Sequence, residues 1–118
     1  MRNLTKKQRK HVRDLLSLAW ERDLSEALNS LRRSFDEWQE GALGAFELDE
    51  AIHRYHKGPS RKIYNMYSSA DQHWELALAA SLHRELLSPG DFPDELWAEI
   101  GERVEDVRSA FFKRHEDE

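Results

Sequence analysis

Cysteine is absent from the 118 residues of the chain. Disulfide bonds, thiolate metal ligands and a cysteine nucleophile are therefore excluded together. The sequence also lacks a run of about 20 apolar residues, which a helix needs to span a bilayer. Its first residues lack the apolar core of a secretory signal. We therefore expect a small soluble protein of the cytoplasm, without a membrane segment.

Residues that favour strands are scarce as well. Valine, isoleucine and threonine together number seven, whereas charged residues make up 35% of the chain. Branched side chains favour β-strands, while Leu, Ala, Glu, Lys and Arg favour helices. The composition therefore predicts an all-α protein. The length of the chain predicts a single helical domain over residues 1–118.

A long N-terminal helix is predicted by apolar residues that recur at helical spacing from Val12 to Trp38. Thr5 and Gln8 form a capping box at its start, and Gly41 supplies a stop signal. Such a helix is about 52 Å long at 1.5 Å per residue. Because a domain of this size is roughly 35 Å across, the helix either kinks near Asp23 or extends beyond one subunit. The unbroken apolar phase favours extension, and with it a homodimer.

The rest of the chain predicts further helices, which would complete a compact bundle of four to five. Gly58 and Pro59 end one helix and begin the next. The loop at residues 88–93 precedes a last helix that contains Leu96 to Phe111. We expect the tail, residues 114–118, to fray. The predicted helices cover residues 47–57, 59–67, 69–87 and the segment around 96–111.

The net charge of −5 hides an asymmetry along the chain. Residues 1–13 hold six basic residues and no acidic one, so residues 14–118 carry −11. An acidic surface is a poor partner for a phosphate backbone. We therefore expect no nucleic-acid partner.

A candidate metal site lies on the helix predicted for residues 47–57. Asp49, His53 and His56 fall on one flank of this helix at 100° per residue. One carboxylate and two imidazoles could bind a divalent metal, or could form an acid–base pair. The alternative is that the histidines only shield the edge of the core. The sequence predicts no other cofactor.

A candidate anion site lies at the predicted helix corner beside it. The start of a helix presents unpaired N–H groups and a partial positive charge. Hydroxyl, imidazole and cationic groups would surround that helix start, and such an arrangement binds phosphate or carboxylate. The alternative is an ordinary corner between helices. The predicted ligand-binding residues are His53, His56, Ser60, Arg61 and Lys62.

The sequence favours a protein–protein interaction or regulatory module, most simply a homodimer, without catalytic activity. Trp and Tyr are enriched where protein surfaces are buried between partners. Trp20 and Trp38 lie on the long first helix and are the predicted interface residues. The competing interpretation is a ligand or metal site within residues 49–62, either enzymatic or merely binding.

Overall fold

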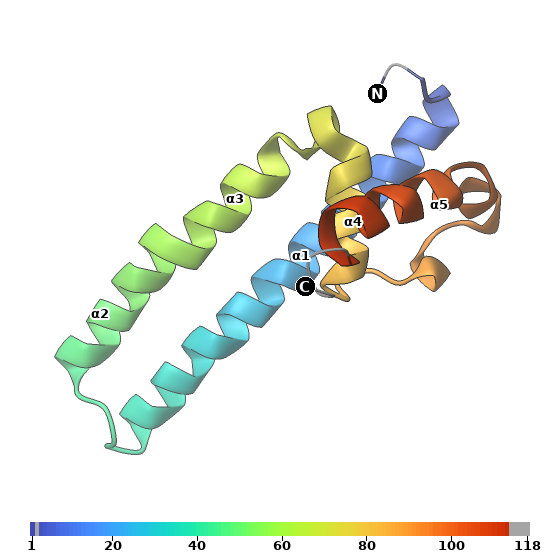
Figure 1. Cartoon of the computed structure of the whole chain (residues 1–118). Helices are drawn as coiled ribbons and strands as arrows, with labels where there is room; N and C mark the ends of the chain where they lie inside the picture. The colour runs from blue at the N-terminus through green and yellow to red at the C-terminus, as the bar shows by residue number, and fades with distance from the viewer. Residues whose placement is uncertain (2, 114–118) are drawn as a thin grey trace. The chain divides into compact units, whose positions relative to one another are not determined.

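The computed structural model describes Met1 and residues 3–113, and every regular element in this part of the chain is helical. The all-α prediction is therefore confirmed. The predicted frayed tail, residues 114–118, lies outside the described residues. The α-helices are α1 (Lys6–Gln39), α2 (Ala45–Tyr55), α3 (Arg61–Ser68), α4 (Trp74–His83) and α5 (Asp94–Arg108) (Figure 1). The π-helical turns are η1 (His56–Ser60) and η4 (Ser109–Lys113), and the 3₁₀ turns are η2 (Ala70–His73) and η3 (Pro89–Asp91).

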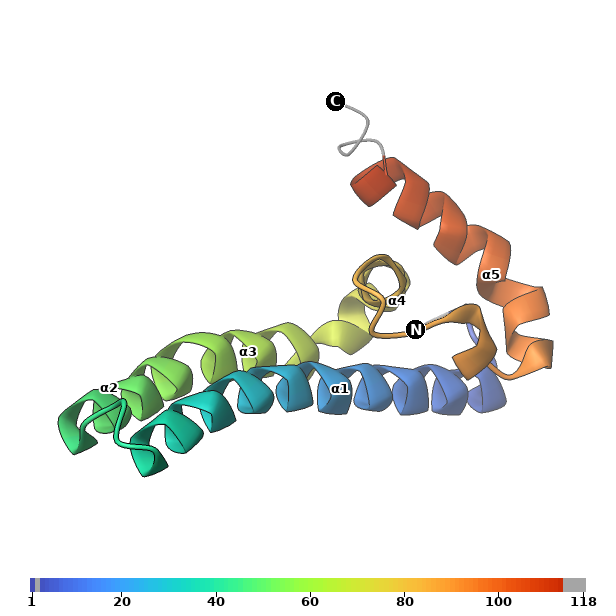
Figure 2. The same ribbon diagram turned by 90° about the horizontal axis from the view of Figure 1, so that it is seen from below.

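Helix α1 has the start and the length that the sequence predicts. The N–H of Gln8 donates to Thr5 Oγ1 at 3.1 Å, and the N–H of Thr5 donates to Gln8 Oε1 at 2.8 Å. This reciprocal pair is a capping box. The helix then passes Asp23, which is buried, without a break (Figure 2). The helix therefore does not end near Asp23, and the prediction of an uninterrupted helix is confirmed.

The end of α1 follows from a glycine. Gly41 has a φ of +83°, in the left-handed region that suits a residue without a Cβ. Its N–H donates to the carbonyl of Trp38 at 3.1 Å, and the N–H of Ala42 donates to that of Glu37 at 2.8 Å. These bonds satisfy carbonyls that the end of the helix leaves unpaired. The predicted stop at this glycine is confirmed.

Backbone contacts divide the chain into two units. Unit 1 consists of Met1–Ala19 and Tyr67–Glu118, and unit 2 consists of Trp20–Met66. Helix α1 runs through both units, because it extends from Lys6 to Gln39. The single domain expected over residues 1–118 stays a prediction.

Unit 1 contains a well-developed apolar core. Helix α4 packs on α5, and the first turns of α1 contribute Val12, Leu15 and Leu16 to the buried residues. Helix α4 buries Leu78 and Ala79 completely. The largest side chains with almost no exposed surface are Leu78, Leu96, Ile100, Val12 and Val104.

The helix predicted over residues 69–87 is shorter in the structure. A 3₁₀ turn occupies Ala70–His73, and α4 ends at His83. Glu85 has a φ of 60°, which no α-helix can accommodate, and the backbone N–H groups of Leu86 and Leu87 both donate to the carbonyl of Ser81. The chain therefore turns early and buries both leucines.

Arg103 links α5 to α4 at the edge of this core. Its Nε and Nη2 donate to the two carboxylate oxygens of Glu75 at 2.9 and 3.1 Å, and its guanidinium lies 5.0 Å from the centre of the Trp74 ring. The hydrogen bond to Glu75 raises the pKa of Arg103, with a smaller contribution from the charge of that carboxylate. A bidentate pair of this kind fixes the orientation of both side chains.

Gly101 gives a test of the packing in unit 1. A Cβ at this buried position would lie 2.8 Å from two atoms of the Trp97 ring. We expect Gly101→Ala to lower the free energy of unfolding by about 1–3 kcal/mol, because overpacking outweighs the higher helix propensity of alanine. Gly58→Ala is the matched control, since its added Cβ meets no atom within 4 Å apart from its chain neighbours and the backbone of its own helix. We expect that change to raise stability by up to about 1 kcal/mol. Urea unfolding followed by circular dichroism measures both, and equal effects would contradict the proposed clash.

Candidate functional site

Unit 2 is a helical hairpin. The last part of α1, from Trp20, lies antiparallel to the segment formed by α2, η1 and α3, and residues 40–44 join the two arms at the tip (Figure 1). The rings of Trp20 and Tyr64 meet edge to face at the other end, with 6.1 Å between centres and 63° between planes. This contact fixes which residues of the two arms lie at the same level.

The prediction of a helix corner at Gly58 and Pro59 is wrong. His56 and Arg61 both have right-handed helical backbone angles, and the N–H of His56 donates to the carbonyls of Ile52 and His53. The N–H of Arg61 likewise donates to the carbonyl of Gly58. The helical path therefore continues from α2 through η1 into α3, with Pro59 inside it. A new helix starting at Arg61 was expected to leave the N–H of that residue unpaired, but this N–H is bonded to Gly58.

Between Tyr55 and Ile63 the chain has one residue more than a regular α-helix needs to keep both side chains on one face. The π-helical turn η1 accommodates this extra residue. Tyr55 and Ile63 are half-buried and buried, yet they are eight positions apart. Seven positions would keep two residues on one face of an α-helix, and an eighth rotates the second by 100°. The wider π turn accommodates the extra residue, so that Ile63 lies on the same face as Tyr55. Such turns are frequent at functional sites, which directs attention to the residues of η1.

A shallow cavity opens beside this π turn. It has a volume of about 520 Å³ and is lined by His56, Ser60, Arg61, Tyr64 and Asn65. Three of the five predicted ligand-binding residues, His56, Ser60 and Arg61, therefore line one cavity. His53 and Lys62 are not among its lining residues. The cavity offers imidazole, hydroxyl, guanidinium and amide groups, which can all donate hydrogen bonds to an anion.

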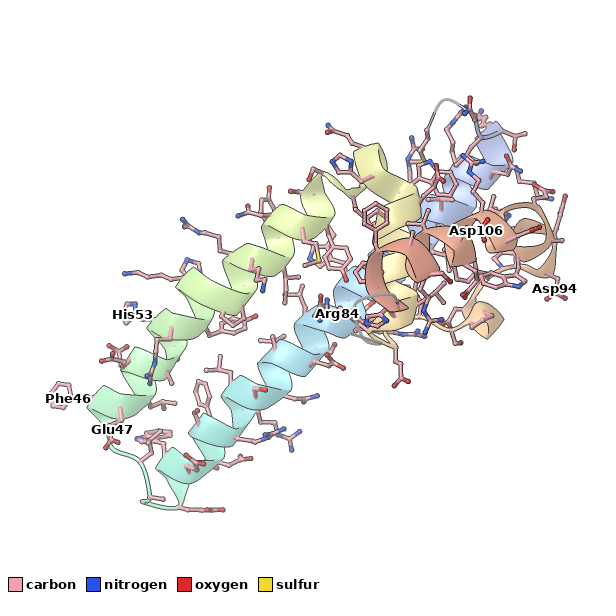
Figure 3. All side chains as sticks on the ribbon, viewed as in Figure 1. Phe46, Glu47, His53, Arg84, Asp94 and Asp106 are labelled. Carbon is pink, nitrogen blue, oxygen red and sulfur yellow. The ribbon has the colours of Figure 1, made fainter. Side chains whose placement is uncertain are left out.

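The three predicted metal ligands do not converge. His53 Nε2 lies 3.6 Å from Asp49 Oδ2, and both side chains are about two-thirds exposed. Among residues 1 and 3–113, no group of three or more His, Asp or Glu side chains is placed to hold a metal ion. His53 points away from α1 (Figure 3). The geometry therefore gives a metal site at Asp49, His53 and His56 no support.

The two units differ strongly in how they bury apolar side chains. Of the described apolar residues, 17 are buried in unit 1 and only two, Leu48 and Ile63, in unit 2. The exposed large apolar residues show the reverse distribution, with two in unit 1 and seven in unit 2. Those of unit 2 are Leu28, Phe35, Trp38, Phe46, Ile52, Tyr64 and Met66.

Four of these seven residues share one side of the hairpin. Each directly follows a residue that is buried or half-buried, and is therefore rotated from it by 100°. The buried or half-buried residues face the other helix, and the residue after each of them is rotated by 100° around the helix axis. Because the two helices are antiparallel, this rotation points to the same side of the pair on both helices. The four pairs are Ala27–Leu28, Ser34–Phe35, Ala51–Ile52 and Ile63–Tyr64.

Polar residues on α2, η1 and α3 follow the same rule. Asp49 follows buried Leu48, His56 follows half-buried Tyr55, and Arg61 follows half-buried Ser60. The same rule places Glu21, Ser25 and Arg32 of α1 on this side. The side that carries these three residues with Leu28, Phe35, Asp49, Ile52, His56, Arg61 and Tyr64 is called the open face below. The cavity lined by His56 and Arg61 lies on it.

The structure modifies the role of the predicted interface tryptophans. Trp20 is half-buried against Tyr64 of its own chain, whereas Trp38 leaves 44% of its surface exposed near the tip. The sequence reasoning did not select Leu28, Phe35 or Ile52. The signal was present, since Leu24, Leu28, Leu31, Phe35 and Trp38 recur at spacings of four and three. The spacing alone does not determine which of these residues are buried within the chain.

Comparisons with protein-family models, with curated proteins and with solved structures give no match to this chain. Among the described helices, none combines the length and the apolar character needed to cross a bilayer.

The π turn gives a prediction about stability. Deleting Pro59 removes both the extra residue and a proline without an N–H, so Tyr55 and Ile63 become seven apart in a regular α-helix. We expect this deletion to raise the free energy of unfolding by about 1–3 kcal/mol.

Deletion of exposed Asn29 from the middle of α1 is the matched control, because it rotates every later residue of a regular helix by 100°. We expect that change to cost about 3 kcal/mol or more. Thermal unfolding followed by circular dichroism compares the two variants. Loss of the fold on deletion of Pro59 would show that the π turn does not hold a surplus residue.

Proposed function

We propose that this protein is a protein–protein interaction module that forms a homodimer through the open face of unit 2. The carrying observation is the contrast in burial, because unit 2 covers two apolar residues and exposes seven. An amphipathic helix must bury its apolar side against another element. Two packed helices bury only the side chains along their line of contact. A second pair of helices would bury the apolar side chains that remain exposed. No catalytic role is assigned to any residue.

A second copy suits the open face in size. Each arm of the hairpin is roughly 30 Å long, and two helices side by side are about 20 Å wide, which gives a face of roughly 600 Å². Stable interfaces bury roughly 600–1,000 Å² of accessible surface on each partner, so the open face is at the lower end of this range. Two such hairpins, face to face, form a four-helix bundle, in which every helix buries an apolar side. A two-fold symmetric pair needs only one self-complementary surface.

The homodimer can be tested with one charged residue on the open face. Leu28 exposes 49% of its surface, so Leu28→Asp should leave the monomer folded. The carboxylate would be buried twice in a symmetric dimer. We expect dimer affinity to fall by about a hundredfold or more, as measured by sedimentation velocity over a range of concentrations.

Phe46→Asp is the matched control. Phe46 is 95% exposed and points away from α1 rather than onto the open face (Figure 3). We expect this variant to dimerise like the parent chain. A parent chain that sediments as a monomer at high micromolar concentration, or equal losses in both variants, would overturn the proposal.

A carboxylate or phosphate site in the cavity is the second candidate function. It is favoured by one observation, namely that His56, Ser60 and Arg61 line the same hollow with Tyr64. Arg61 can hold either anion through two parallel hydrogen bonds. The N–H of Arg61 already donates to the carbonyl of Gly58, so the donors named here are side chains.

Inorganic phosphate, compared with chloride at equal ionic strength, tests this second function. A ligand that binds only the native state raises the melting temperature. We expect phosphate to stabilise the parent chain and to lose this effect in Arg61→Ala. Arg33→Ala, which removes an exposed arginine of α1, is the control and should respond like the parent. No shift in the parent chain would exclude the anion site.

A further inference from the structure

We propose that the outer side of the arm formed by α2, η1 and α3, which is the side turned away from α1, binds the phosphate backbone of a nucleic acid. Four exposed cations carry this inference and are called the basic stripe below, namely Arg54, Lys57, Arg61 and Lys62. The stripe shares only Arg61 with the open face, so its binding does not depend on the proposed homodimer.

The basic stripe lies in a part of the chain that lacks acidic residues. Residues 51–70 contain no Asp or Glu, and the four cations fall within positions 54–62. The acidic balance of the whole chain, which predicts no nucleic-acid partner, is an average over all of its surfaces. Exposed charges are screened beyond a Debye length of about 8 Å at physiological ionic strength. The local charge of the arm therefore decides whether a polyanion binds there.

The cations of the stripe stand on the outer half of the arm. Tyr55 and Ile63, which are half-buried and buried, face α1. Each cation is one or two positions from the nearer of these two residues, which rotates it from α1 by 100° or 200°. His53 is likewise two positions from Tyr55, and it points away from α1 in Figure 3. The four positive charges therefore share one side of the arm, and no acidic residue lies between them.

None of the four cations is neutralised within its own chain. Over Met1 and residues 3–113, the basic stripe forms no ion pair and no side-chain hydrogen bond. The cations at the start of α1 differ in this respect. Lys7 Nζ lies 3.1 Å from Glu95 Oε2. Lys10 Nζ lies 3.2 Å from Asp14 Oδ2. The positive charge of the stripe thus remains available to a partner.

The density of charge on the stripe suits a row of phosphate groups. Its four charges span eight helical steps, or about 12 Å, which is about one charge in every 4 Å. One strand of a duplex carries a negative charge about every 3.4 Å along the axis. Arginine donates two parallel hydrogen bonds to a phosphate, and lysine attracts it as a point charge. Such contacts do not read the bases, so the expected binding is independent of sequence.

The outer side lacks what a bilayer or a protein partner requires. A helix that lies on a bilayer inserts an apolar side, and protein interfaces are centred on apolar or aromatic residues. The stripe contains no apolar residue, since Ile52 lies on the open face and Ile63 is buried. Phe46 is exposed and points away from α1, but Asp49 and Glu50 come between it and the stripe in the sequence. An anionic bilayer would repel those two carboxylates.

Fluorescence anisotropy of a labelled DNA duplex of mixed sequence tests the inference. We expect the parent chain to bind with a Kd of roughly 1–100 µM at physiological salt. Four phosphate contacts from one stripe predict that log Kd rises with the logarithm of salt concentration with a slope of about 3.6. Lys57→Glu combined with Lys62→Glu removes two of these contacts and places two negative charges beside the phosphates. We expect this double variant to bind about tenfold more weakly or worse, and to lower the slope by about 2.

Lys6→Glu combined with Lys10→Glu is the matched control, because it changes the net charge equally at exposed positions of α1. We expect this control to bind the duplex within about threefold of the parent. Circular dichroism shows whether each variant stays helical, and vesicles of phosphatidylserine and phosphatidylcholine in equal parts test the bilayer as the partner. Equal losses in the two double variants, no duplex binding at about 50 mM salt, or tighter binding to the vesicles than to the duplex would each overturn the inference. A parent chain that binds the duplex as a monomer would support the stripe and refute the homodimer alone.

Discussion

The constraint on which the structure depends is that two helices cannot cover their own apolar surfaces. In unit 1, three helical segments and the loop around Phe92 surround a common core, and most apolar side chains there are buried. In unit 2 each arm has only one neighbour within the unit, so the apolar side of an amphipathic helix extends past the line of contact. Leu28, Phe35 and Ile52 lie on that extension. The hairpin therefore holds most of the exposed large apolar residues, and the proposed homodimer would cover those on the open face.

The π turn shows how a local irregularity serves this arrangement. The surplus residue between Tyr55 and Ile63 would rotate α3 off the hairpin if the helix stayed regular. The turn keeps Ile63 buried and sets His56 and Arg61 beside Tyr64 around one cavity. A chain with a regular helix in this place would present a different set of groups. The same five residues thus decide both the packing of the hairpin and the chemistry of its open face.

Affinity in the proposed dimer has its physical source in the exposed apolar side chains of unit 2. Burial of leucine, phenylalanine and isoleucine side chains supplies a driving force that has no preferred direction.

The sequence by itself determined the helical class, the unbroken first helix and both of its ends, because capping boxes, a left-handed glycine and apolar spacing act over a few residues. Local signals failed at Gly58 and Pro59, which usually separate helices. Here the helical path continues through both residues, and the π turn places Ile63 in the buried contact between the two arms, so no corner forms. The sequence selected His56, Ser60 and Arg61 from their composition, but only the fold placed them in one cavity and left His53 outside it. Which apolar residues stay uncovered was likewise decided by tertiary structure, since exposure depends on how many neighbours a helix has and not on its own periodicity.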